Sequence, residues 1–375
     1  MELEKKSPDY CLFVVVIILL SIGTCMIFSS SFIMADKWYG DSYYFLKKQI
    51  FYAIIALIVL LFSMNIDYHF YKKVSTPLLI ISIILLSAVF IPGVGRSAGG
   101  AVRWVKFGIL SFQPSEIAKF ALILYMSESM TRKGMNDLKT FAKGILPSLI
   151  VIGVIFVLIL KEPDFSTALI ILGISFVMLF IGGTKIIQLF TLMAAAIPMG
   201  VLILLREEYR KVRLLAFLDP WKDPLDSGFH VIQSLVALGS GGITGVGLAE
   251  SRQKYFYLPD QHTDFIFSII GEELGFIGTV FIVVLFALLL WRGYRIAIQS
   301  TDNFACLLAT GITFVIVFQS MINIGVVTKM LPTTGITLPF ISWGGTSLII
   351  NMLCIGILLN ISRFKLKEET KNRWE

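Results

Sequence analysis

Long apolar segments, each bounded by charged residues, constrain this chain more than any other feature of its sequence. A helix needs roughly 20 apolar residues to cross a bilayer, and the candidate spans are residues 11–33, 50–66, 78–94, 115–130, 144–160, 165–181, 186–205, 265–291, 304–324 and 339–361. Only 15% of the 375 residues are charged, against about 25% in soluble domains. The sequence therefore predicts an all-α polytopic membrane protein with about ten transmembrane helices, in which residues 1–375 form a single membrane domain.

The distribution of Lys and Arg predicts how the chain is oriented in the membrane. An even number of spans places both termini on one side. Among the short loops, Lys and Arg are more frequent on the side of the termini, which favours a cytoplasmic position for both. The clearest marker is the tail, residues 362–375, with Arg363, Lys365, Lys367, Lys371 and Arg373. Residues 206–263 then form one large extracytoplasmic loop.

Charge and cysteine content exclude several classes of function. The net charge of +7 comes from cations at the ends of spans, and no basic stretch with interleaved aromatic residues predicts a nucleic-acid partner. The four cysteines lie in apolar stretches and form no CxxC pair. Neither a disulfide framework nor a zinc site is therefore expected.

The large loop contains one helical pattern and several spaced cations. Apolar side chains recur at helical spacing in residues 229–238, which predicts a short amphipathic helix, either on the outer membrane surface or packed on the bundle. The glycine-rich residues 239–247 lack the features of a nucleotide-binding loop and are interpreted as a flexible loop. Arg213, Arg252 and Lys254 are candidates for holding a diphosphate or for contacting anionic lipid headgroups.

Charged residues in or beside the spans are candidates for function because they are costly in a bilayer. Glu116 and Lys119 are three residues apart and can pair across one helical turn, either as a structural ion pair or as a polar wall of a substrate cavity. Arg103 precedes them in a polar segment. Asp164 precedes the span at 165–181, where an N-cap is the first interpretation and a place in the cavity is the alternative.

A further acidic cluster begins at Asp264, at the outer start of an apolar helix. Phenylalanines on either side of Ile266 would keep its surroundings partly dry, and such burial tunes a carboxylate as a general base. Glu272 and Glu273 lie about 12 Å deeper along the helix, too far to act with Asp264, and are interpreted as structural. His262 is interpreted as an interfacial polar residue, and the sequence leaves any metal ligands unknown.

Residues 323–347 interrupt apolar sequence with two prolines and several glycines. Broken backbone at membrane depth is tolerated only where protein covers it or where it lines a wet cavity. This segment therefore predicts a cavity on the outer side of the protein.

These motifs together resemble the SEDS family (shape, elongation, division and sporulation), and the FtsW/SpoVE branch more than RodA. They occur in the family's order over nearly the whole chain: FQPSE-x-x-K at 112–119, Glu-Pro-Asp at 162–164, RQKYFYLP at 252–259, TDFIF and GEELG at 263–275, and LP-x-TGITLPFISWGG at 331–345. One departure is Lys329, where the family commonly has glycine.

The resemblance implies a peptidoglycan glycosyltransferase that polymerises lipid II at the outer face of the bacterial inner membrane, at the septum or forespore. The implied partners are a class B penicillin-binding protein and other membrane proteins of division or sporulation. Asp264 matches the family's essential acidic residue, and Arg103, Glu116, Lys119 and Asp164 match polar cavity positions.

The expected chemistry follows from the substrate that the resemblance implies. The acceptor hydroxyl needs a base, for which Asp264 suffices, and direct displacement predicts inversion to a β-1,4 product. The diphosphate leaving group needs positive charge, from Arg213, Arg252, Lys254 and Lys119 or from a divalent cation such as Mg²⁺ or Mn²⁺. Two alternatives are a flippase for lipid II and a non-catalytic scaffold.

Overall fold

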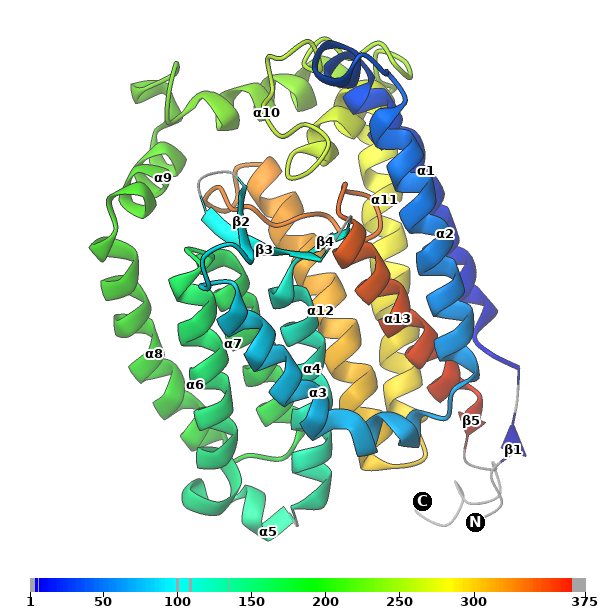
Figure 1. Cartoon of the computed structure of the whole chain (residues 1–375), viewed down its shortest axis with the longest axis vertical. Coiled ribbons are helices and arrows are strands. Elements are labelled where there is room, and N and C mark those ends of the chain that lie inside the picture. The colour runs from blue at the N-terminus through cyan, green and yellow to red at the C-terminus, as the bar shows by residue number, and fades with distance from the viewer. Residues whose placement is uncertain (1–3, 6, 99–100, 108–109, 134, 366–375) are drawn as a thin grey trace.

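The computed structural model describes residues 4–5, 7–98, 101–107, 110–133 and 135–365, and most of them are helical (Figure 1). Every predicted span overlaps a helix: α1 Tyr10–Tyr39, α2 Tyr44–Asn65, α3 Tyr68–Ala88, α4 Pro114–Arg132, α6 Leu146–Lys161, α7 Phe165–Ile181, α8 Ile186–Arg206, α11 Ile266–Ile298, α12 Asn303–Val327 and α13 Gly345–Ser362. Eight helices of the described residues are long and apolar enough to cross a membrane alone. Helix α7 is shorter, and α4 carries several charges. The predicted polytopic all-α class is confirmed.

Both termini lie at the same end of the bundle (Figure 1). There β1 (Glu4–Lys5) pairs antiparallel with β5 (Phe364–Lys365). The short helix α5 (Met135–Leu138) and a π-helical turn at Phe141–Ile145, which continues into α6, connect α4 to α6. This arrangement agrees with an even number of spans, and the cytoplasmic position of the termini stays a prediction.

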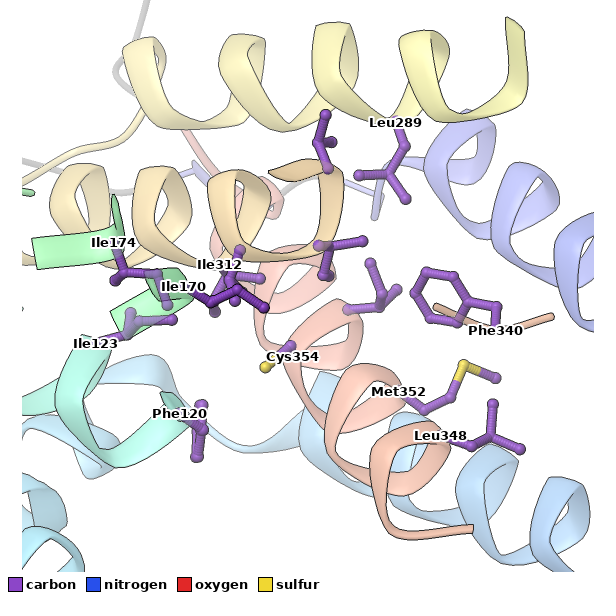
Figure 2. Packing of buried hydrophobic residues seen from close by; sticks show 14 of the residues in the cluster. Phe120, Ile123, Ile170, Ile174, Leu289, Ile312, Phe340, Leu348, Met352 and Cys354 are labelled. Atoms are coloured by element: carbon purple, nitrogen blue, oxygen red, sulfur yellow. The ribbon is translucent and has the colours of Figure 1, made fainter. Parts of the chain in front are cut away.

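The bundle core is formed by helices that are distant in sequence. Ile123 of α4, Ile170 of α7, Ile312 of α12 and Cys354 of α13 are buried near one another (Figure 2). Helix α8 is the opposite case, because Leu189 is its only buried residue. An apolar helix with so little protein contact is stable only where lipid covers its remaining faces, as expected for a membrane span.

A three-stranded antiparallel sheet between α3 and α4 was not predicted. It consists of β2 (Gly95–Ala98), β3 (Ala101–Phe107) and β4 (Leu110–Phe112), in the order β2-β3-β4. It lies toward the end of the bundle that carries the large loop (Figure 1). The valines and aromatic residues of β3 favour strands, and the sheet carries Arg96 and Arg103 to the functional site.

The large loop contains helix α9 (Glu208–Leu218), a 3-10 turn at Pro220–Lys222 and helix α10 (Phe229–Gly241). Helix α10 confirms the predicted helix at 229–238, and it takes the packed alternative. Its Ser234 side chain contacts Ser268 of α11 at 2.9 Å and donates to the carbonyl of Val327 at 2.8 Å. The expected apolar face is only partly correct, because Ile232 is buried while Val236 is exposed.

The glycine-rich segment after α10 packs on a kink in α11 at Gly275, whose φ of 67° breaks the helix. Its backbone is hydrogen-bonded to the kink on both sides: Val246 N donates to Glu272 O at 3.0 Å, and Phe276 N donates to Gly242 O at 2.9 Å. The loop thus satisfies polar groups that the kink exposes. Residues 242–247 are therefore held in place, which corrects the interpretation as a flexible loop.

We predict that Gly241→Ala destabilises the protein by about 1–3 kcal/mol, because a Cβ at Gly241 would overlap the carbonyl oxygen of Gly271. Gly239→Ala is the matched control on the same helix, since a Cβ there meets nothing within 4 Å. Alanine at Gly239 should be neutral or stabilising by up to about 1 kcal/mol. Thermal unfolding of the purified variants in detergent measures both, and equal effects would contradict the close packing of α10 on α11.

Candidate active site

A cavity of about 1090 Å³ opens at the end of the bundle that carries the large loop. One wall is formed by the irregular segment between α12 and α13, including Leu331–Gly335 and Trp343–Gly345. The predicted cavity beside the broken segment is thus confirmed. The other walls come from the sheet, the start of α7 and helix α9.

The lining combines charged and apolar side chains. The charged groups are four arginines and three aspartates: Arg96, Arg103, Arg210, Arg213, Asp164, Asp260 and Asp264. The apolar groups include residues of α7, α8, α9 and α12: Leu169, Leu204, Leu214, Phe318 and Ile322. Such a cavity suits an amphiphile that carries anionic groups on a hydrocarbon chain.

Asp264 is fixed in the cavity through its backbone. The Asn323 amide donates to the carbonyl of Asp264 at 2.8 Å and to the carbonyl of Ile336 at 2.7 Å. The Ser342 hydroxyl donates to the carbonyl of Thr263 at 2.6 Å. These bonds fasten the residues before α11 to the segment between α12 and α13. Asn323 is only 1% exposed, and its polar side chain inside an apolar helix was the available signal for this positioning role.

Gly335 lies between the Asp264 carboxylate and the guanidinium of Arg103. A Cβ built on Gly335 would lie 3.6 Å from Asp264 Oδ2 and 3.9 Å from Arg103 Nη1. Burial, and next the negative charge of Asp260, raise the pKa of Asp264 to about 7, while Arg213 and Arg103 oppose the rise. A carboxylate whose pKa lies near neutral pH is suited to accept a proton during a reaction.

Of the four arginines that line the cavity, Arg103 and Arg210 are held by protein contacts, whereas the guanidinium of Arg213 lies 5.9 Å from the ring of Tyr209. Arg103 donates to the carbonyls of Glu162 and Pro163, at 3.2 and 2.5 Å. Arg210 lies 5.3 Å from the ring of Phe165, so it joins α9 to the start of α7. Arg213 has no hydrogen bond or ion pair to the described residues, and its guanidinium is available for an anion.

Asp164 has both of the roles that the sequence allowed, as an N-cap of α7 and as a residue of the cavity. Its carboxylate accepts hydrogen bonds from the backbone and side chain of Thr167, at 3.1 and 2.9 Å, and so caps α7. It also lines the cavity. The cap fixes the first turn of α7 beside the arginines.

Glu116 and Lys119 form the expected pair, but they lie outside the lining. Lys119 Nζ is 2.8 Å from Glu116 Oε1 and 2.9 Å from Gln319 Oε1, and both charged residues are buried. Gln319 in turn donates to the carbonyl of Thr337, a cavity residue, at 3.1 Å. The structure thus favours the structural interpretation, in which the pair supports the cavity from behind.

Arg252 and Lys254 do not join the cavity lining either. Lys254 is fully buried, and its Nζ pairs with Glu273 Oε1 at 3.3 Å. Glu273 also accepts from Ser29 of α1 at 2.6 Å, while Glu272 accepts from the backbone of Arg252 at 2.9 Å. This corrects the expected contact of Lys254 with a diphosphate, since its charge is neutralised inside the protein. The two glutamates are structural, as interpreted.

We predict that Glu162→Gln makes the protein more stable, and more so at higher pH. Glu162 is 1% exposed, and neither carboxyl oxygen has a hydrogen-bond partner among the described residues. Burial, and next the charge of Asp164, raise its pKa to about 8, with Arg103 opposing. The folded state therefore binds the proton more tightly than the unfolded state, and stability falls as pH rises from about 4.5 to about 8.

The gain from Glu162→Gln at pH 8 should exceed the gain at pH 5 by at least about 1.4 kcal/mol, the equivalent of one pKa unit. Thermal unfolding at both pH values measures the difference. Glu208→Gln is the control, because the side chain of Glu208 is 80% exposed. A pH-independent effect at Glu162 would show that the carboxyl group is ionised in the folded protein.

Known proteins resemble this chain over nearly its whole length. Residues 9–367 match the FTSW_RODA_SPOVE family, described as "Cell cycle protein". Stage V sporulation protein E of Bacillus subtilis (strain 168) is 43% identical over 364 residues, covering 97% of this chain and 99% of the relative. The probable peptidoglycan glycosyltransferase FtsW of Geobacter sp. (strain M18) is 44% identical over 357 residues, covering 95% and 97%.

Two solved structures share the fold. One, titled "Structural coordination of polymerization and crosslinking by a peptidoglycan synthase complex", superposes with a TM-score of 0.77 at 26% identity, covering 95% of this chain and 98% of its own. The crystal structure of the Rod shape determining protein RodA of Thermus thermophilus gives a TM-score of 0.69 at 25% identity, covering 95% and 97%.

Proposed function

The chain belongs to the FtsW, RodA and SpoVE family of cell cycle proteins, as its motifs predicted, and from that premise we propose that it polymerises lipid II into glycan strands. It is a peptidoglycan glycosyltransferase by its similarity to the FtsW relatives that carry this name. The observation that carries the proposal is the Asp264 carboxylate, placed beside Arg103 in a cavity lined by both charged and apolar side chains.

In the proposed reaction, Asp264 is the general base. It removes the proton from the acceptor sugar hydroxyl while the hydroxyl oxygen attacks the anomeric carbon of the donor. The bond from that carbon to the diphosphate oxygen breaks, and the diphosphate departs with the electron pair. A single displacement of this kind inverts an α-linked donor to a β-1,4 product, by analogy with inverting glycosidases.

The leaving diphosphate requires positive charge and no acid. Arg213 is the best placed cation, because its guanidinium makes no hydrogen bond or ion pair with the described residues, and Arg103 lies close to Asp264. A divalent cation such as Mg²⁺ or Mn²⁺ would supply the same charge. The described residues contain no group of three His, Cys, Asp or Glu that would hold such an ion, so the proposal assigns no residue to it.

The proposal extends to place and partners. The chain would act in the bacterial inner membrane with both termini cytoplasmic, at the septum or forespore. A class B penicillin-binding protein would crosslink the strands, in line with the solved relative whose title joins polymerization to crosslinking in one complex. Other membrane proteins of division or sporulation would complete the assembly.

A polymerisation assay with the purified full-length protein tests the proposal. Lipid II and Mg²⁺ are added with and without a class B penicillin-binding protein, and glycan products are separated on a gel. Polymer formation supports the glycosyltransferase. If no polymer forms under either condition, lipid II translocation in liposomes tests the flippase. The flippase predicts that Glu116, Lys119 and Asp164 matter for transport as much as Asp264 does, whereas only the two aspartates line the cavity.

A further inference from the structure

A second pocket, of about 250 Å³, has Phe364 of β5 in its lining, and β5 lies at the end of the bundle opposite helices α9 and α10 (Figure 1). It is enclosed by the residues that begin α1, the last turns of α11 and the end of α13. The proposed reaction uses none of its residues. Its polar groups include Ser7, Asp9, Arg292, Arg295 and Gln299.

The pocket contains one arginine that the protein neutralises and one that it leaves unpaired. Arg292 pairs with Asp9, with Nε and Nη2 at 2.9 and 2.5 Å from Oδ2. Asp9 also caps α1 by accepting from Leu12 N at 3.1 Å. Arg295 has no carboxylate within 4.0 Å among the described residues and lies 5.5 Å from the ring of Trp291. Within the part of the chain that the structure describes, the pocket therefore keeps one unpaired cation, and the side chains of Ser7 and Gln299 make no hydrogen bond there.

Exposed aromatic residues place this pocket at the depth of the lipid headgroups. Tyr10 of α1 is 64% exposed, and Trp291 and Tyr294 of α11 are 50% and 60% exposed. Trp and Tyr concentrate at the membrane–water interface, where their rings contact both lipid and water. Basic pockets between transmembrane helices at this depth bind anionic headgroups. A soluble anion would need no such aromatic surroundings.

We propose that this pocket binds the phosphodiester headgroup of an anionic membrane lipid. Arg295 provides the main charge, and the side chains of Ser7 and Gln299 donate hydrogen bonds to the phosphate oxygens. Arg292, held by Asp9, forms the rear of the pocket. The bound headgroup would join the start of α1 to the end of α11, so the lipid would stabilise the bundle at the end away from catalysis.

Native mass spectrometry of the full-length protein tests this proposal, with phosphatidylglycerol and phosphatidylcholine as probes. Phosphatidylglycerol should bind at least 10-fold more tightly than phosphatidylcholine. Arg295→Gln should reduce its affinity at least 5-fold, and Arg295→Lys should retain part of it. Lys73→Gln is the matched control, because Lys73 is an exposed cation near the start of α3 that lies outside the pocket. The affinity of the Lys73→Gln variant for phosphatidylglycerol should stay within 2-fold of that of the original protein.

The midpoint temperature of thermal unfolding shows whether the ligand is a lipid or soluble phosphate. Phosphatidylglycerol should raise it in the original protein and not in Arg295→Gln, whereas inorganic phosphate at millimolar concentration should leave both unchanged. An equal rise with inorganic phosphate would overturn the lipid assignment. Equal lipid affinity in Arg295→Gln and the original protein would overturn the site itself.

Discussion

Replacing Asp264 by Asn is expected to reduce glycan polymerisation by about 10²–10⁴-fold, the usual contribution of a positioned general base. The amide has the same shape as the carboxyl group but cannot accept the proton of the acceptor hydroxyl. The fold should persist, because the bond that holds this position runs from Asn323 to the backbone carbonyl of Asp264. The measurement is the initial rate with lipid II, alongside the thermal midpoint as a check of folding.

The pH profile adds a test that a purely structural role would not pass. The ionised carboxylate is the active form, so activity should fall as pH drops through about 7, the raised pKa of Asp264. Asp260 contributes to that rise, and Asp260→Asn should therefore move the acidic limb to lower pH. Wild-type polymerisation by a folded Asp264→Asn protein would refute the assignment of the base.

The ten helices were predictable because the bilayer imposes a local rule on the sequence. An apolar segment must satisfy its backbone within itself, so every predicted span overlaps a helix, although the ends differ, as at α3 and α13. The sheet at β2–β4 follows no such rule, since its strands are short, their residues show no long apolar alternation, and the β2–β3 pairing shifts register between Arg96 and Ser97. The buried face of α10 was partly missed for a related reason. The buried face also includes the small residues Ser234, Ala237 and Gly241, beside Val231 and Ile232, and the close contact of Gly241 with α11 is not visible in an apolar pattern.

The type of chemistry in the active site was predictable from the sequence, but the set of residues that line it was only partly predictable. One cavity is lined by four of the candidate residues, which come from separate parts of the sequence: Asp264, Asp164, Arg103 and Arg213. Lys254 also belongs to one of the sequence motifs, yet Glu273 neutralises its charge. The two residues are 19 positions apart, and no sequence pattern predicts that they form a pair. Its contrast with Arg213 shows that a charge is available to a ligand only when the fold supplies no counter-ion.

The structure explains why glycine is common in the family at the position of Lys329. Lys329 occupies a position where glycine is common, and its φ of 56° lies in the left-handed region that glycine favours. It follows the end of α12, where the backbone N–H groups of Met330 and Leu331 both donate to Gly325 O. The departure therefore concerns how a helix ends, and it leaves the residues around Asp264 unchanged.

Lys119→Met is expected to destabilise the protein by about 3–5 kcal/mol, because it leaves the buried carboxylate of Glu116 without its partner. Both side chains are under 10% exposed, and water cannot replace the lost interaction. The same change also removes the donor to Gln319 Oε1. Thermal unfolding in detergent and the yield of folded protein measure the loss.

The double variant Glu116→Gln, Lys119→Met decides between the two interpretations of this pair. Replacing both charges removes the uncompensated carboxylate, so most of the lost stability should return, apart from about 1–3 kcal/mol for the unpaired Gln319 oxygen. If the pair only supports the cavity from behind, polymerisation should return with stability. A double variant that regains this stability but stays inactive would mean that Glu116 or Lys119 contacts the substrate directly, against their position outside the cavity lining.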